Sequence, residues 1–130
     1  MLFSCNAFKI SNYKSKSSND KTIRSYYENG NIEYQAKYLN GKLDGLSTTW
    51  HLNGKISSES YYNNGLPHGV WKKYHVNGKI LYYVEYEFGK KNGKEQWYYN
   101  NGMIQSEQNF IYGEKDGNLI RWRADGTLLY

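Results

Sequence analysis

The sequence predicts an all-β protein, an elongated and twisted antiparallel meander of stacked β-hairpins that needs no helix. Glycine recurs every 24 residues, at Gly30, Gly54, Gly78, Gly102 and Gly126, and such a fixed period indicates a repeat architecture. Between the glycines, apolar and polar residues alternate with the period of two that is typical of half-buried strands. The chain also has 15 Tyr and 4 Trp residues, and aromatic side chains suit a pleated, half-covered surface.

All 13 glycines fall on this lattice, because two further series have the same spacing. They are Gly41, Gly65, Gly89 and Gly113, and Gly45, Gly69, Gly93 and Gly117. Only glycine adopts positive φ without a steric cost, so each glycine is expected to mark a turn or a bend. The turn glycines of the central repeats are Gly54, Gly65, Gly69, Gly78, Gly89 and Gly93.

Side-chain parity predicts how the strands are connected. A three-residue loop, Leu52-Asn53-Gly54, in which a type I turn ends in a left-handed glycine bulge, pairs Trp50 with Ile56 on one face. The other connection, from Asn63 to Gly69, is expected to be longer. It forms a compact double bend between strands at about 55–63 and about 69–76.

Apolar residues that recur at the same repeat position are expected to gather on one face and form the thin core of the sheet. They are Trp50, Ile56, Tyr62, Tyr74, Ile80, Tyr86, Tyr98, Ile104, Phe110 and Trp122. The second face is the candidate binding face, because it carries Trp, Tyr and Arg, which dominate interface hot spots. Its candidate residues are Trp71, Tyr83, Trp97 and Arg121.

The repeat domain is expected to span residues 20–130, with four full copies and partial copies at both ends, after a flexible or tether-like segment, residues 1–19. The single cysteine, Cys5, excludes an internal disulfide. The opening Met-Leu-Phe-Ser-Cys-Asn resembles the end of a bacterial lipoprotein signal. If translation starts upstream of Met1, Cys5 is the expected lipidation site and the protein is a membrane-anchored lipoprotein of the cell envelope; as written, the chain is expected to be cytoplasmic.

Charge and motifs constrain the chemistry. The net charge of +5 is dispersed except from Lys9 to Arg24, and no nucleic-acid motif occurs, so nucleic acid is not expected as a partner. No Ser-His-Asp grouping, HExxH run or nucleotide-binding glycine pattern is present, so neither an enzyme nor a cofactor is expected.

His51 and His75 occupy equivalent positions in successive repeats. These positions are two strands apart, which is about 9.5 Å at about 4.7–4.9 Å per strand. Zinc ligands lie within about 2.1 Å of the metal, so no metal site is expected and both histidines should face outward.

A family resemblance rests on the run from Tyr38 to Gly45, followed by Trp50 and Asn53-Gly54. It resembles the MORN repeat variant of bacterial proteins, often described as YwqK-type antitoxins. Similar runs begin at Tyr62, Tyr86 and Phe110. The resemblance implies an extended, twisted antiparallel sheet, a role in protein or membrane association, no catalytic residues and, for an antitoxin, a partner toxin. The run from Gly93 to Gly102 also resembles wall-binding repeats that hold choline or glucan, but those repeats are shorter than 24 residues.

These observations predict a non-enzymatic, repeat-based binding module that engages a protein, such as the toxin partner of an antitoxin or immunity-type protein. Two alternatives stay open. One is an envelope-surface attachment module that binds lipid head groups or glycan. The other is a structural scaffold that self-associates through sheet edges, where unpaired strands can add a further strand.

Overall fold

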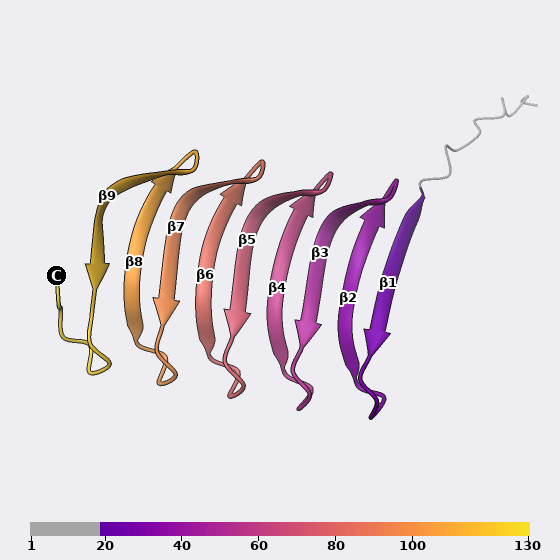
Figure 1. Ribbon diagram of the computed structural model, residues 1–130, viewed down its shortest axis with the longest axis horizontal. Coiled ribbons are helices and arrows are strands. Elements are labelled where there is room, and N and C mark those ends of the chain that lie inside the picture. Colours follow the sequence, from indigo (N-terminus) through magenta and orange to yellow (C-terminus); the bar gives the residue numbers. More distant parts are fainter. Residues whose placement is uncertain (1–18) are drawn as a thin grey trace, which may run out of the picture.

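One open β-sheet makes up the computed structural model, which describes residues 19–130 (Figure 1). Its nine strands follow one another in sequence order, each antiparallel to the next. They are β1 Asp20–Tyr26, β2 Ile32–Leu39, β3 Lys42–Trp50, β4 Ile56–Asn63, β5 Leu66–Tyr74, β6 Ile80–Glu87, β7 Lys90–Tyr98, β8 Ile104–Ile111 and β9 Glu114–Arg121. The predicted all-β meander is therefore confirmed. Within residues 19–130 there is no helix of the length and hydropathy that a membrane crossing requires.

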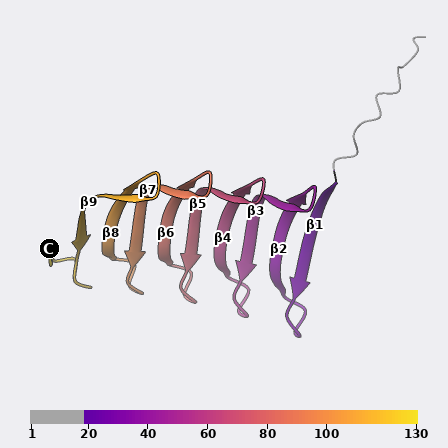
Figure 2. The same ribbon diagram turned by 45° about the horizontal axis from the view of Figure 1, so that its top comes forward.

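The turns that follow β1, β3, β5 and β7 are three-residue loops, and Figure 2 shows them in a row at one end of the strands. After β3, the His51 amide donates to the Lys55 carbonyl at 2.8 Å and the Gly54 amide donates to the His51 carbonyl at 2.9 Å. Gly54 has a φ of 84°, and Trp50 pairs with Ile56. The predicted glycine-bulge turn is confirmed.

The opposite connections are two-residue hairpin turns, and the predicted double bend is wrong. Asn63 pairs with Leu66, and the two residues between them, Asn64 and Gly65, have φ values of 49° and 83°. Positive φ at both positions defines a type I′ turn, whose twist matches that of the flanking strands. The second strand therefore starts at Leu66. The prediction that Gly69 and Gly93 are turn glycines is wrong, because they lie inside β5 and β7, where φ values of 72° and 118° accommodate bulges.

A second irregularity changes which residues share a face. Thr49 pairs with Ser58 while Trp50 pairs with Ile56, so Ser57 is an extra residue and the alternation is reset at the start of β4. The same shift occurs where β5 meets β6 and where β7 meets β8. Tyr62, Tyr86 and Phe110 consequently lie on the opposite face from Trp50, Tyr74 and Tyr98. The prediction that all recurring apolar residues share one face is therefore wrong.

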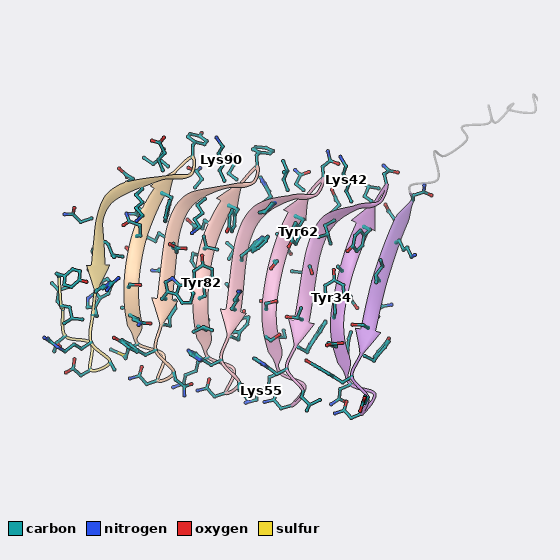
Figure 3. All side chains as sticks on the ribbon, viewed as in Figure 1. Tyr34, Lys42, Lys55, Tyr62, Tyr82 and Lys90 are labelled. Atoms are coloured by element: carbon teal, nitrogen blue, oxygen red, sulfur yellow. The ribbon has the colours of Figure 1, made fainter. Side chains whose placement is uncertain are left out.

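We name the two faces after their tryptophans. The Trp71 face carries two rows of paired residues: Ala36, Ser47, Ser60, Trp71, Val84, Glu95 and Gln108, and Tyr34, Thr49, Ser58, Lys73, Tyr82, Trp97, Ser106 and Arg121. The Trp50 face carries Trp50 and the row Thr48, Glu59, Lys72, Tyr83, Gln96 and Glu107. Figure 3 labels Tyr34, Tyr62 and Tyr82, which belong to the Trp71 face.

The core of this single-layer sheet is thin. Among residues 19–130, the buried apolar residues are Ala36, Val84 and Phe110, and all three lie on the Trp71 face. The other predicted core residues are half-buried, and Ile56 is exposed. The described part of the chain forms this one sheet and no second layer, so a side chain there is buried where its neighbours on the same face cover it.

Side chains at the three-residue turns connect each repeat to the next. His51 Nε2 lies 3.0 Å from the Tyr74 carbonyl oxygen, and His75 Nε2 lies 3.3 Å from that of Tyr98. The Asn53 side-chain amide donates to the Val76 carbonyl at 3.1 Å. Both histidines are half-buried, so the prediction that they face outward is wrong: the ring bridges two turns instead.

The two-residue turns that begin at Asn64, Phe88 and Tyr112 are each held by a side chain of the preceding repeat. The Asn64 amide donates to Asp44 Oδ2 at 3.0 Å, and the next Gly65 amide donates to the Leu43 carbonyl at 2.7 Å. At the equivalent position of later repeats, His68 Nδ1 and Asn92 Oδ1 accept in the same way, at 3.4 and 3.1 Å. This position varies in sequence because an acceptor atom suffices.

Candidate functional site

A row of four residues on the Trp71 face forms the candidate site. Tyr82, Trp97, Ser106 and Arg121 are successive Cα partners on β6, β7, β8 and β9. The rings of Tyr82 and Trp97 are in contact at a tilt of 44°, with their centroids 4.4 Å apart. At the other end of the row, the Arg121 guanidinium lies over the Tyr130 ring, with Cζ 5.7 Å from the centroid. In this row, the small side chain of Ser106 lies between these two pairs.

The gap above Ser106 is a hollow in the sheet surface. Its lining includes Glu95, Trp97, Ser106, Gln108, Lys115 and Arg121. Trp97 and Arg121 lie two strands apart, which corresponds to about 9.5 Å and leaves room for one planar group. We call this gap, defined by Trp97, Ser106 and Arg121, the slot.

The same sheet shows what fills such a spacing. Tyr62 and Tyr86 are also two strands apart, and the ring of Trp71 lies between them, at centroid distances of 5.0 and 4.9 Å. The Trp71 indole N–H is also satisfied, because it donates to the Tyr61 carbonyl at 2.7 Å. Trp71 therefore has an aromatic ring on each side, whereas Trp97 has one aromatic neighbour, Tyr82, among residues 19–130 and keeps 42% of its surface exposed.

The slot carries positive charge. Lys115 and Arg121 are exposed, and neither forms an ion pair within the part of the chain that the structure describes. The acidic lining residue, Glu95, is already engaged by the Lys91 ammonium and by the Tyr82 hydroxyl. Burial and the hydrogen bond to Glu95 raise the pKa of Tyr82 well above its usual value, so this hydroxyl stays protonated and keeps donating.

The four predicted binding residues are only partly brought together. Trp97 and Arg121 form the walls of the slot, and Trp71 lies on the same face between Tyr62 and Tyr86. Tyr83 lies on the Trp50 face, where its hydroxyl donates to Glu85 at 2.7 Å; this bond and burial raise the pKa of Tyr83 to about 12. Cys5, the predicted lipidation site, lies outside the described residues.

Sequence reasoning missed Ser106, the residue that creates the slot. A signal was available: Tyr34, Ser58, Tyr82 and Ser106 occupy one repeat position, 24 residues apart, and alternate between large and small. This alternation identifies a gap only when the strand register is known, because the residues on either side of each position belong to neighbouring strands. Ser58 lies between Thr49 and Lys73, which offer no ring, whereas Ser106 lies between Trp97 and Arg121.

Four consecutive matches to the MORN repeat variant model cover residues 19–40, 43–64, 67–87 and 91–112. This chain belongs to the MORN repeat variant family. Each matched MORN repeat contains one hairpin with its three-residue turn, and the type I′ turns join one MORN repeat to the next. Trp97 and Ser106 lie in the fourth MORN repeat, and Arg121 follows it.

Other comparisons add little to the MORN family assignment. No characterised protein matches the sequence. Two solved structures show a likeness at 14% identity: a TarM mutant of S. aureus in complex with fondaparinux, alpha-GlcNAc-glycerol and UDP, with a TM-score of 0.44, and TarM, with a TM-score of 0.43. Each match covers 77% of this chain and 21% of the TarM chain, so this chain spans about a fifth of its length. TM-scores this low carry no argument.

The slot offers stacking surface and charge. Trp97 presents a ring face, Arg121 a planar cation, and Lys115 a second cation. Within residues 19–130, no group of three or more His, Cys, Asp or Glu side chains is arranged to hold a metal ion. This arrangement can bind and orient a planar, electron-rich group.

Proposed function

We propose that this chain is a non-enzymatic binding module that holds a protein partner on the Trp71 face. The observation that carries the proposal is the open slot, where Trp97 is backed by Tyr82 and faces Arg121 across an unfilled gap. Exposed Trp, Tyr and Arg side chains supply a large share of the binding energy in protein interfaces. A repeat sheet also presents them on a broad, rigid surface.

The resemblance to YwqK-type antitoxins supports a finer version of this proposal, in which the partner is a toxin and the module has an antitoxin or immunity-type role. Neutralisation would follow from occupation of the partner's surface and needs no catalytic residue in this chain. This version predicts that the partner is encoded beside the gene for this chain.

Two adjacent lysines test which face binds. Lys73 pairs with Ser58 and Tyr82 on the Trp71 face, whereas Lys72 pairs with Glu59 and Tyr83 on the Trp50 face. A photo-crosslinking phenylalanine analogue would replace either lysine in the full chain. The chain would be expressed in its source cells and irradiated, and adducts would be identified by mass spectrometry.

We expect one protein to be cross-linked from position 73 and little or none from position 72. Comparable adducts from both positions, or adducts from position 72 alone, would contradict the assignment of the Trp71 face. No protein adduct from either position would contradict the proposal that the module binds a protein.

Self-association through a sheet edge is a second candidate function, and the outer edge of β1 favours it. All but one of the β1 residues are exposed, and among residues 19–130 the sole pairing partner of β1 is β2. By contrast, the Arg121 end of β9 is covered, because the Arg121 amide donates to the Tyr130 carbonyl and the Leu129 amide to the Arg121 carbonyl. Light scattering that shows the monomer mass of 15.3 kDa across a broad dilution series would rule this candidate out.

A further inference from the structure

We infer that the slot accepts one aromatic side chain of the partner protein, with an acidic residue next to it in the partner's sequence. This inference rests on the proposed function, because it names what part of a protein partner the Trp71 face recognises. It is carried by the spacing of the two walls, by the chemical nature of each wall and by the charge around them.

The walls are positioned before anything binds. Trp97 is held from behind by Tyr82, and Arg121 is held from behind by Tyr130. The strands that carry the two walls are about 9.5 Å apart, which leaves room for one aromatic ring between Trp97 and Arg121. Trp71 shows that a ring is accommodated at this spacing in the same sheet, because it lies between Tyr62 and Tyr86 in tilted contact with both. An aromatic side chain in the slot would complete a continuous row from Tyr82 to Tyr130.

Arg121 selects an aromatic ring over a sugar. A sugar can lie on the Trp97 ring, but it has no π electrons to offer the guanidinium on the other side. An aromatic ring would stack on Trp97 with one face and make a cation–π contact with Arg121 through the other. The slot therefore favours an aromatic side chain of a protein over a glycan.

The surrounding charge selects an acidic neighbour. Lys115 and Arg121 have no carboxylate partner in residues 19–130, while Glu95 is occupied by Lys91. A carboxylate beside the bound ring would meet two exposed cations at the rim of the slot, and such a contact adds specificity and depends on salt.

A short peptide and one pair of matched variants test the inference. The probe is Ac-Ser-Phe-Glu-Glu-Ser-NH2, titrated into the full chain labelled with ¹⁵N on its Trp indoles. Ser106→Tyr fills the slot from within, and Ser58→Tyr makes the same change at the equivalent position of another repeat. Both substitutions restore the Tyr that Tyr34 and Tyr82 place at this repeat position, so the sheet accommodates them.

We expect the peptide to shift the indole N–H signal of Trp97. The dissociation constant should lie in the millimolar range, because one side chain of the peptide makes most of the contact. Ser106→Tyr should weaken binding by about tenfold or more, and Ser58→Tyr by less than about twofold. Two further peptides separate the contribution of the aromatic ring from that of the acidic residues. The peptide with Phe-Gln-Gln in place of Phe-Glu-Glu should bind several times more weakly. The peptide with Ala-Glu-Glu in that place should leave the Trp97 signal unshifted.

Three results would overturn the inference: no Trp97 shift with the Phe-Glu-Glu peptide, equal binding by the Ser106→Tyr variant, or an equal shift with the Ala-Glu-Glu peptide. A shift with a neutral glucose oligomer that matches the peptide's would assign the slot to glycan instead. The cross-linking result is independent of these: a protein adduct from position 73 with a silent slot refutes this inference alone, and the absence of any adduct refutes the proposed function.

Discussion

Replacement of Gly93 by alanine should be far more damaging than the same replacement at Gly117, although both glycines occupy one repeat position. Gly93 has a φ of 118°, well outside the left-handed well near about 57°. The space that its Cβ would need is taken by the Glu85 carboxylate. That carboxylate accepts hydrogen bonds from the Lys94 amide, at 2.8 Å, and from the Tyr83 hydroxyl, at 2.7 Å.

The expected loss follows from these contacts. Backbone strain of a non-glycine residue at such a φ costs about 1–3 kcal/mol, and each hydrogen bond lost when Glu85 is displaced costs about 1 kcal/mol. Gly93→Ala should therefore lower the free energy of unfolding by about 3–5 kcal/mol. At Gly117, φ is 71° and no atom lies within 4 Å of an added Cβ, so Gly117→Ala should cost only about 1–2 kcal/mol.

Equilibrium urea unfolding followed by tryptophan fluorescence measures both losses, and a double variant isolates the steric part. In a Glu85→Ala background the space is free, so Gly93→Ala should then cost only the backbone strain, about 1–3 kcal/mol. Equal losses at Gly93 and Gly117, or a Gly93 loss that does not change in the Glu85→Ala background, would show that the Glu85 carboxylate does not restrict the space at Gly93.

Two further predictions use matched controls. Asp44→Ala should lower the free energy of unfolding by about 1 kcal/mol, because the Asn64 amide loses its hydrogen-bond acceptor. Asp116 occupies the same repeat position, but residues 19–130 contain no later two-residue turn whose amide it could accept. Asp116→Ala should therefore change the free energy of unfolding by less than about 0.5 kcal/mol. A similar loss at both sites in urea titrations would contradict the role of Asp44. Alkaline pH should destabilise the fold: the pKa of Tyr83 is raised to about 12, so the folded state keeps its proton longer than the unfolded chain, whose value is 10.0. This contribution is complete below pH 10 and is lost as the pH rises toward 12. Tyr83→Phe should make the decline shallower between pH 10 and 12 in urea titrations at fixed pH, whereas Tyr112→Phe, at an exposed turn position, should leave it unchanged.

The type of one turn could be predicted from residues near it in the sequence, whereas the type of the other could be recognised only once the pairing with the neighbouring strand was known. The loop closed by Gly54 was predictable, because an Asn-Gly pair and the parity of Trp50 and Ile56 are local signals. The Asn64-Gly65 turn was mispredicted, because Gly69, four residues on, was assigned to the same bend. Gly69 instead allows a bulge inside β5, a feature defined by its pairing with β4 and β6.

The candidate site was predictable only in part. Trp97 and Arg121 were expected on a binding face from residue type alone, and the structure places them as the two walls of the slot. Ser106 was missed, because a small polar residue becomes informative only when its flanking strands are known. Tyr83 was placed on the wrong face relative to Trp97, since the two residues lie on different strands and their relation depends on register.

The sequence by itself determined the period, the all-β class and the positions at which the backbone adopts positive φ at a glycine, since positive φ and strand alternation are properties of single residues and their near neighbours. Only the tertiary structure decided which side chains meet. One extra residue at Ser57 reverses the face of everything that follows in β4, because side chains alternate along a strand. The slot arises in the same way, from residues of β7, β8 and β9 that are distant in sequence and become neighbours through strand pairing.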